Sequence, residues 1–245
     1  MDAADSKRVL VIIPAFNECY NLPRTIAEIR RVIHYADIVV IDDGSQDATC
    51  QIARECGVIV LRLVFNLGIG GAVQTGLLYA VKHGYEVTVR IDADGQHDPD
   101  DVARLLEPLF NGAADMVIGS RFLAQRRAGY RPGFLRHAGI RYLSMWINLL
   151  VKSKVTDPTS GFCAWNRRAI RKFSSKYPID FPEPEAIVLA SRCGLRIKEV
   201  AVTMRERYAG VTTINQWKSL YYLLKVTFAL GLHMMKPKRG VPDER

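Results

Sequence analysis

Short β-branched runs alternate with helical stretches through the first half of the chain, and this alternation constrains the fold more than any other feature of the sequence. The runs are residues 9–13, 37–41, 58–63, 87–91 and 116–118. Helical stretches follow at residues 21–34, 46–56, 70–83 and 100–111. Strands and helices in this order form an open parallel sheet with helices on both faces. The sequence therefore predicts an α/β fold of the Rossmann-like kind.

The second half of the chain has a different pattern, but no linker separates it from the first. From about residue 130 a basic, aromatic segment leads into DPTSGF and then a turn-rich FPEPEA. RIKEVAVTM at residues 196–204 predicts a late strand that rejoins the sheet. We therefore expect one domain rather than two.

Composition is that of an ordinary globular protein, with 49% hydrophobic and 24% charged residues among 245. The five cysteines are scattered and show no CxxC spacing, so we expect reduced thiols and no zinc site. The first apolar run is too short and too poorly flanked for a signal peptide, which predicts a cytoplasmic location. The net charge of +9 fits anionic lipid, phosphorylated substrates, nucleic acid or simply a solvated basic surface.

Unusual residues follow three of the predicted strands. PAFNE occupies residues 14–18, DDGSQD residues 42–47 and DADGQHD residues 92–98. In open α/β sheets, ligands bind outside the carboxyl ends of the strands. We therefore expect a ligand site where these three turns meet.

The DADGQ turn carries the sharpest chemical signal. Asp92, Asp94 and Gln96 place two carboxylates and an amide at alternate positions, and such hard oxygen ligands suit Mg²⁺ or Mn²⁺. A bound cation would neutralise charge on a diphosphate leaving group. The alternative is a turn or helix cap built from acids, with Asp98 as a candidate cap.

The second strand end presents Asp42 and Asp43, followed by Ser45. These groups could accept hydrogen bonds from a nucleobase or ribose. Alternatively they form a solvated turn, with Ser45 or Asp47 capping the next helix.

The glycine-rich stretch from Gly68 to Gly76 resembles a phosphate loop or dinucleotide turn only superficially. No Lys-Ser/Thr pair follows Gly76, and Val73 stands at the place of the third dinucleotide glycine. It is more consistent with a tight turn into a helix packed closely on the sheet.

Taken in order, these motifs resemble the family 2 glycosyltransferases of GT-A fold. The matching segments are PAFNE, VVIDDGSQD, NLGIGGAVQTG, DADGQHDP, GSRF, DPTSGF, EPEA and RERYAG. Within that family the chain is most similar to the polyprenyl-phosphate glycosyltransferases, the group that includes dolichol-phosphate mannose synthase. The resemblance implies an inverting, Mg²⁺- or Mn²⁺-dependent transfer from a UDP- or GDP-linked sugar to a polyprenyl phosphate or membrane-associated glycan, in cell envelope biosynthesis.

The resemblance also assigns roles to residues and segments. The residues implied to bind donor or acceptor are Pro14, Ala15, Phe16, Glu18, Asp42, Asp43, Ser45, Asp92, Ala93, Arg121, Ser160, Gly161 and Arg207. Those implied in metal binding are Asp92, Asp94 and Gln96. Those implied in catalysis are Asp94, Arg121, Asp157 and Glu185. A nucleotide-sugar half is expected at residues 1–125, an acceptor half at 126–210, and an amphipathic segment with a basic tail at 211–245.

Glu185 of EPEA is the candidate general base, although Glu183 or Glu185 could equally cap the helix. Arg121 and Arg207 would face the phosphates of donor and acceptor, because a guanidinium fork suits planar anions. Two departures from the family pattern stand out: Ile69 replaces a lysine often found in the NxGKG turn, and Thr212 and Thr213 replace a Ser-Lys pair.

Residues 219–235 are almost wholly apolar but include Lys225 and are too short to span a membrane. They predict an interfacial helix on the inner face of the membrane, supported by Lys236, Lys238 and Arg239. The alternative is a helix packed on the core or on a partner, either a second copy or a membrane protein. Nucleic acid is not an expected partner.

Two rival functions fit parts of the sequence. A sugar-phosphate nucleotidyltransferase would carry a glycine-rich, basic loop after the first strand, which PAFNE is not. The other rival function is that of a nucleotide-sugar-binding subunit of a membrane complex, which would bind the donor without catalysing a reaction.

Overall fold

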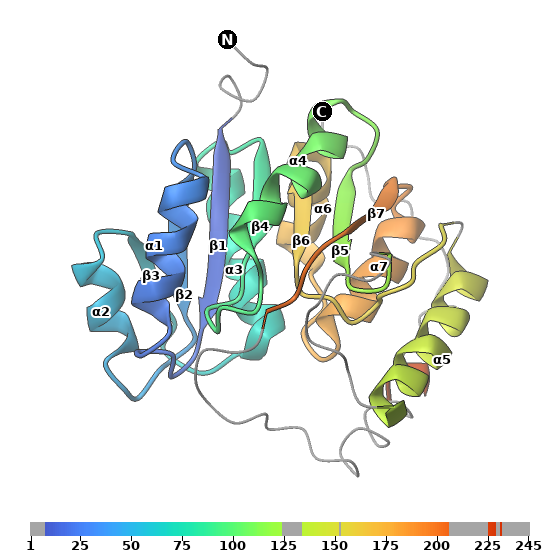
Figure 1. Ribbon diagram of the computed structural model, residues 1–245, viewed down its shortest axis with the longest axis horizontal. Coiled ribbons are helices and arrows are strands. Elements are labelled where there is room, and N and C mark those ends of the chain that lie inside the picture. The colour runs from blue at the N-terminus through green and yellow to red at the C-terminus, as the bar shows by residue number, and fades with distance from the viewer. Residues whose placement is uncertain (1–7, 124–133, 152, 206–224, 229–230, 232–245) are drawn as a thin grey trace.

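The computed structural model describes residues 8–123, 134–151, 153–205, 225–228 and 231, and a seven-stranded sheet runs through its centre (Figure 1). The strands are β1 (Val9–Ala15), β2 (Asp37–Asp42), β3 (Ile59–Arg62), β4 (Val87–Arg90), β5 (Met116–Ser120), β6 (Cys163–Asn166) and β7 (Ile197–Ala201). Their order is β3-β2-β1-β4-β6-β5-β7. Only β6 runs antiparallel to its neighbours, so the predicted mostly parallel α/β sheet is confirmed.

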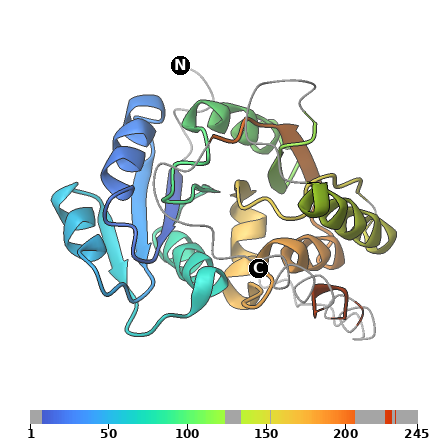
Figure 2. The same cartoon turned by 60° about the horizontal axis from the view of Figure 1, so that its bottom comes forward.

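Helices cover both faces of this sheet (Figures 1 and 2). They are α1 (Leu22–Val32), α2 (Thr49–Glu55), α3 (Gly68–Lys82), the short 3-10 helix η1 (Pro99–Asp101), α4 (Val102–Phe110), α5 (Phe134–Leu150), α6 (Arg167–Lys176) and α7 (Pro182–Arg192). Two apolar cores result: α1, α2 and α4 contribute to one, and α3, α5, α6 and α7 to the other. The chain therefore builds three layers, with the sheet in the middle.

Strand β1 shows why an unbroken apolar run is needed at the centre of such a fold. All seven of its residues are buried. Val9, Val11 and Ile13 join one core, whereas Leu10 and Ile12 join the other, as the twofold alternation of a strand requires. Gly76 lets α3 approach closely, because a Cβ there would lie 2.5 Å from the Ile12 side chain. The predicted close packing of this helix is confirmed.

Three local predictions need correction. Strand β6, within the DPTSGFCAWN segment, was not predicted and interrupts the parallel order between β4 and β5. The late strand is β7, which ends at Ala201 rather than Met204. Ser45 does not cap α2, whose N-cap is Ala48 without a side-chain bond, whereas Asp98 does cap the 3-10 helix that precedes α4.

Asp115 is a buried acid at the amino end of β5, opposite the ligand-binding edge. Its carboxylate accepts hydrogen bonds from the backbone and guanidinium of Arg196 and from Asn166, and Arg168 lies 3.3 Å away. Burial alone would raise the pKa of Asp115, but the bonds from Arg196 and Asn166 outweigh burial and lower the pKa to about 2. This carboxylate therefore ties β5, β6 and β7 together.

Asp115→Asn should lower the free energy of unfolding by about 2 kcal/mol near neutral pH, because a pKa depressed by roughly two units stores that much stability. A depressed pKa stabilises the fold above the unfolded-state value of 3.8 and loses that contribution as pH falls through the folded value. The unfolding free energies of wild type and variant, measured in urea, should therefore begin to converge below about pH 4 and should meet near pH 2. Asp100→Asn, whose partner Arg31 is also exposed, is the control and should change stability by no more than about 1 kcal/mol. If the difference in unfolding free energy between wild type and Asp115→Asn stayed the same at low pH, the depressed pKa of Asp115 would not be its source.

Candidate active site

A pocket of about 300 Å³ opens at the carboxyl ends of the central strands. Its lining comes from the end of β1, from the turns after β1, β2 and β4, and from the start of α3 with the residue Asn66 just before it. The residues are Pro14, Ala15, Phe16, Glu18, Asp43, Asn66, Gly68, Ile69, Ala72, Asp92, Ala93 and Asp94. The expected meeting of three strand-end turns is thus observed.

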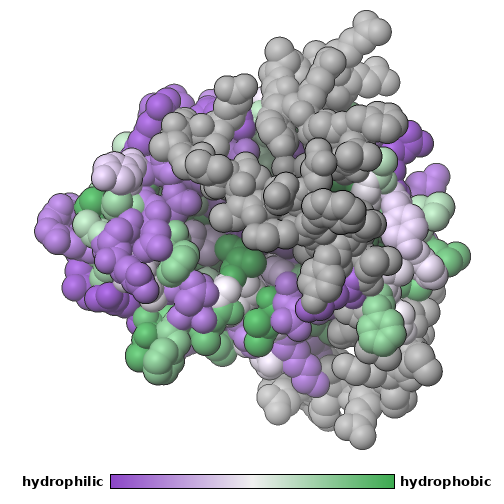
Figure 3. All heavy atoms as spheres, turned by 90° about the horizontal axis from the view of Figure 1, so that it is seen from below, coloured by the Kyte–Doolittle hydropathy of each residue, from purple (hydrophilic) through white to green (hydrophobic). Residues whose placement is uncertain are grey.

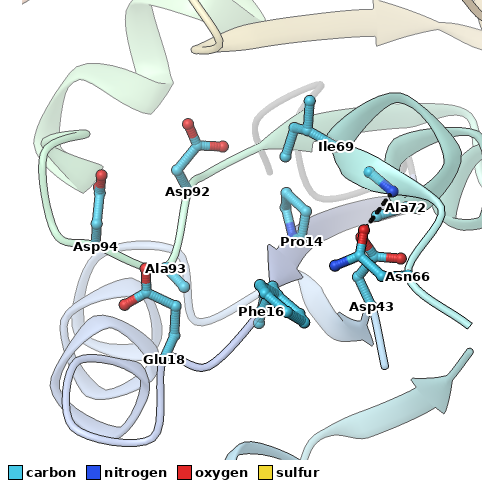
Figure 4. A pocket seen from close by; sticks show the side chains of 12 residues that line it. Pro14, Phe16, Glu18, Asp43, Asn66, Ile69, Ala72, Asp92, Ala93 and Asp94 are labelled. Atoms are coloured by element: carbon cyan, nitrogen blue, oxygen red, sulfur yellow. Dashed lines mark hydrogen bonds between the residues drawn. The ribbon is translucent and has the colours of Figure 1, made fainter. Parts of the chain in front are cut away.

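The lining residues divide into two sides (Figure 4). In this view Asp92, Asp94 and Glu18 lie on one side, and Asp43 and Asn66 on the other. Pro14 and Phe16 lie between them. The pocket therefore has an acidic end at the DADGQ turn and a second polar end at Asp43, separated by a partly apolar floor.

The turn after β1 is fixed by bonds to the turn after β2. Asn17, in the left-handed region at φ 55°, donates its backbone N–H to Ser45 Oγ at 2.9 Å and accepts the Gln46 N–H at 2.9 Å. Glu18 donates its backbone N–H to Thr49 Oγ1 at 2.8 Å. Ser45 does not line the pocket; it holds in place the loop that does.

Asp42 and Asp43 have different surroundings. Asp42 is fully buried, accepts the Ser45 N–H at 3.0 Å and lies 3.3 Å from Arg62, outside the pocket lining. Asp43 lines the pocket and accepts the Leu67 N–H at 2.7 Å, which connects it to the glycine-rich turn. Burial raises the pKa of Asp43. Of this pair, only Asp43 can reach a ligand in the pocket.

The glycine-rich turn supplies four lining residues that the sequence analysis did not assign to the pocket: Asn66, Gly68, Ile69 and Ala72. Asn66 Oδ1 accepts the Gly68 N–H at 3.0 Å, and Gly68 has φ 76°, a conformation that favours glycine (Figure 4). The NLGIGG sequence predicts a packing turn, and the structure shows that the same turn also lines the pocket.

The DADGQ turn places two acids in the pocket. Asp94 is buried and accepts the Gln96 N–H at 3.0 Å, and Gly95 allows the turn with φ 78°. Gln96 is half-buried and is not part of the lining. Among the described residues, no group of three or more His, Cys, Asp and Glu side chains is arranged as a metal cluster.

Two buried residues hold Asp92. His97 stacks on Phe162 at 4.6 Å between ring centroids, and its Nδ1 accepts the backbone N–H of Asp92 at 3.0 Å. Burial lowers the pKa of His97, which favours the neutral ring that this bond requires. Arg90 donates to the Asp92 carboxylate at 2.8 and 3.3 Å, and to Glu183 at 2.8 Å. The sequence analysis missed Arg90, although a basic residue inside an apolar strand beside an acid was a usable signal.

The charge of the pocket is one-sided. Four carboxylates line it, from Glu18, Asp43, Asp92 and Asp94, and among the described residues the lining includes no Lys, Arg or His. A diphosphate would be repelled by such a wall, because like charges at short range cost free energy. Mg²⁺ is commonly held by one or two carboxylates together with substrate phosphates, and Asp92 and Asp94 fit that pattern.

Arg121 and Asp157 form a buried ion pair outside the pocket lining. Arg121 donates to both carboxylate oxygens of Asp157 at 2.6 Å and to Thr159 at 2.7 Å. Glu199 of β7 accepts the backbone N–H groups of Thr156 and Asp157 at 2.8 Å. In this structure the guanidinium fork is therefore engaged by Asp157.

The remaining predicted residues lie in three places. Ser160 is buried, and Gly161 lies against Arg90 and Asp92. Glu185 is 9% exposed in the first turn of α7, near Glu183, and the N-cap residue of that helix is Phe181. Arg207 lies outside the described residues, as do Thr212, Thr213 and most of the 219–235 segment.

Apolar side chains are exposed near the glycine-rich turn. Val64 is 86% exposed and Phe65 75% exposed. The molecule seen from the strand ends shows apolar side chains among hydrophilic ones (Figure 3). Within the part of the chain that the structure describes, no helix combines the length and apolar character needed to cross a bilayer.

Comparison with known proteins gives one family. Residues 10–174 match the model described as Glycosyl transferase family 2. The chain is 31% identical over 241 residues to the UDP-N-acetylglucosamine–dolichyl-phosphate N-acetylglucosaminyltransferase of Methanococcus voltae, covering 89% of this chain and 95% of the relative. It is 33% identical over 222 residues to the undecaprenyl-phosphate mannosyltransferase of Micrococcus luteus, covering 85% and 88%.

A solved structure supports the same architecture. Glucosyl-3-phosphoglycerate synthase from Mycobacterium tuberculosis, in complex with Mn²⁺, uridine diphosphate and glucosyl-3-phosphoglycerate, superposes with a TM-score of 0.67 at 20% identity. The superposition covers 99% of this chain and 83% of that one. At this identity the likeness shows the fold, and the expected GT-A-like arrangement is confirmed.

Asp157→Asn should lower the free energy of unfolding by about 3–5 kcal/mol, because it leaves the buried Arg121 charge uncompensated. Urea unfolding measures the loss. The matched control is Asp180→Asn at an exposed acid, which should shift stability by no more than about 0.5 kcal/mol. Equal stability of the two variants would show that the ion pair does not support the fold.

Proposed function

The chain belongs to glycosyl transferase family 2, and we propose that it moves a sugar from a nucleotide diphosphate donor to a polyprenyl phosphate or membrane-associated glycan, with inversion at the anomeric carbon. Family membership makes it a glycosyltransferase, which replaces the nucleotidyltransferase and non-catalytic alternatives. Donor, acceptor and stereochemistry are the parts proposed here.

The observation that supports cation dependence is the four-carboxylate lining of the pocket. A donor diphosphate would be repelled by these carboxylates, so we propose that a bound cation is required to offset the repulsion. Ile69 sharpens this requirement, since it lines the pocket where relatives often carry a lysine. Asp92 and Asp94 would hold Mg²⁺ or Mn²⁺, with Gln96 as a proposed further ligand, and the bound ion would neutralise charge on the leaving diphosphate.

The remaining lining residues would hold the nucleotide. Asp43 has one oxygen bonded to Leu67, and its carboxylate is proposed to accept a hydrogen bond from the base. Pro14, Ala15 and Phe16 would contact the nucleotide from the floor, with Glu18 and Ala93 beside the phosphates. Asp42 and Ser45 are proposed to act by holding the turns, given their places outside the lining.

The acceptor side is proposed to involve α7 and the segment before β6. An acceptor oxygen would attack the anomeric carbon from the face opposite the diphosphate, so the new C–O bond forms as the bond to the leaving oxygen breaks. Glu185 would take the proton of a hydroxyl acceptor; an ionised phosphate acceptor needs no base. Asp157, Ser160 and Gly161 would border the donor sugar, and Arg121 and Arg207 are proposed to face phosphates.

Work at a membrane surface is proposed from the lipid-phosphate acceptors in the names of the two relatives. The segment at residues 211–245 is proposed as an interfacial helix with a basic tail, on a peripheral protein at the inner face of the membrane. Residues 1–125 and 126–210 are proposed as the nucleotide-sugar and acceptor halves. A second copy or a membrane-protein partner remains an alternative occupant of the C-terminal surface.

Asp94→Ala should abolish Mn²⁺-dependent sugar transfer to a polyprenyl phosphate, by a factor of about 10³ or more, because a ligand to the cation is lost. Release of nucleotide diphosphate, with and without Mn²⁺, measures the effect. Glu55→Gln, on the exposed face of α2, is the control and should keep wild-type turnover. Full turnover in Asp94→Ala would refute the assignment of the DADGQ turn.

A screen of UDP-, GDP- and dTDP-sugars should reveal one nucleotide that raises the melting temperature, and only in the presence of Mn²⁺. Selective binding to the folded state adds about 2.7 kcal/mol of stability at a ligand concentration one hundred times its Kd. If a nucleotide sugar raised the melting temperature equally when a metal chelator was present, this would argue against a cation between the diphosphate and the carboxylates of Asp92 and Asp94.

A further inference from the structure

Arg90 is a buried cation at the end of β4, with two acidic partners from distant parts of the chain. It is 3% exposed. Its Nε and Nη2 donate to Asp92 at 2.8 and 3.3 Å, and its Nη1 donates to Glu183 at 2.8 Å. The two acids raise the pKa of Arg90 well above its usual value, against the opposing effect of burial, so the side chain is a permanent charge.

The guanidinium has no room to move independently of its partners. A Cβ at Gly161 would lie 2.7 Å from Nη2 of Arg90 and 3.0 Å from Oδ2 of Asp92. Only glycine lets this loop lie so close to the ion pair. In a close-packed interior of this kind, a shift of one group displaces its neighbours.

The two partners of Arg90 belong to different functional elements. Asp92 lines the pocket and is a proposed cation ligand. Glu183 lies in the first turn of α7, two residues before Glu185, the proposed base on the acceptor side. Arg90 is therefore the charged bridge between the proposed cation site and the helix that carries the acceptor-side glutamate.

We propose that Arg90 is a positioning residue that couples occupancy of the cation site to the placement of α7. The inference rests on the proposed function, in which Asp92 holds Mg²⁺ or Mn²⁺. Asp92 would share its carboxylate between Arg90 and the cation, so its interaction with Arg90 would weaken and the Arg90–Glu183 interaction would strengthen. The first turn of α7 becomes more firmly held, and by linkage a firmly held α7 raises cation affinity.

Hydrogen–deuterium exchange of the full chain, with and without saturating Mn²⁺, tests the coupling. In the wild type and in the control Glu55→Gln, Mn²⁺ should slow amide exchange at residues 182–187 about fivefold or more, the lower range of typical coupling. In Glu183→Gln this response should disappear, although Mn²⁺ still binds, with an affinity lowered by a similar factor. Calorimetry with Mn²⁺ alone measures that affinity.

Arg90→Lys is the second variant, because it keeps the charge and loses the fork that reaches both acids. It should bind Mn²⁺ but show less than half of the wild-type protection of α7. If Arg90 only supported the fold, Arg90→Lys would change overall stability but would leave the Mn²⁺-dependent protection of α7 as it is in the wild type.

Two failures can be told apart. If Mn²⁺ binds the wild type and Asp94→Ala abolishes that binding, but exchange at 182–187 does not change or changes equally in Glu183→Gln, the coupling is wrong and the proposed function stands. If Mn²⁺ does not bind the wild type in the presence or absence of nucleotide, both the cation site and the coupling are wrong.

Discussion

Carboxylates crowded at the carboxyl ends of buried strands are the constraint on which the rest of this structure depends. Removing an ionised group from water costs several kcal/mol unless a partner replaces the lost solvation. Inside the fold, Arg90 and Arg121 supply those partners for Asp92 and Asp157. Toward the pocket, the described lining carries four carboxylates and no cationic side chain, which would favour a ligand that brings positive charge with it. The ion pairs inside the fold and the acidic lining of the pocket together define the site.

Much of the fold could be predicted because its central strands β1, β2, β4 and β5 are almost wholly buried and consist mainly of apolar residues. The five early strands and their helices follow from this pattern, and the sheet edge they define locates the pocket. Strand β6 could not be found in this way. It has four residues, CAWN, and leads directly into α6, so its length and composition do not distinguish it from a turn. Its place depends on partners far away in the sequence.

The site shows the same division. The DADGQ acids, Asp43 and the PAFNE residues could be predicted because each lies at or just after the carboxyl end of a strand, and all of them except Asn17 line the pocket. The supporting contacts could not: the Ser45–Asn17 and Arg90–Glu183 bonds join residues 28 and 93 positions apart. Local patterns carry no information about such pairs. The engagement of Arg121 by Asp157 was likewise not evident from either motif alone.

The reversed direction of β6 has a consequence for how this architecture can diversify. Strand β6 runs antiparallel to β4 and β5, so it starts at the edge of the sheet where those two strands end. The segment that precedes β6, with Asp157 and Gly161, therefore lies on the pocket side of the sheet. Apart from Asp157 and Gly161, that segment could change in length or sequence while the register of the sheet stays intact. New function on this scaffold can therefore come from insertion ahead of a single short strand, while the pairing of β1, β2 and β4, whose carboxyl ends border the pocket, is kept.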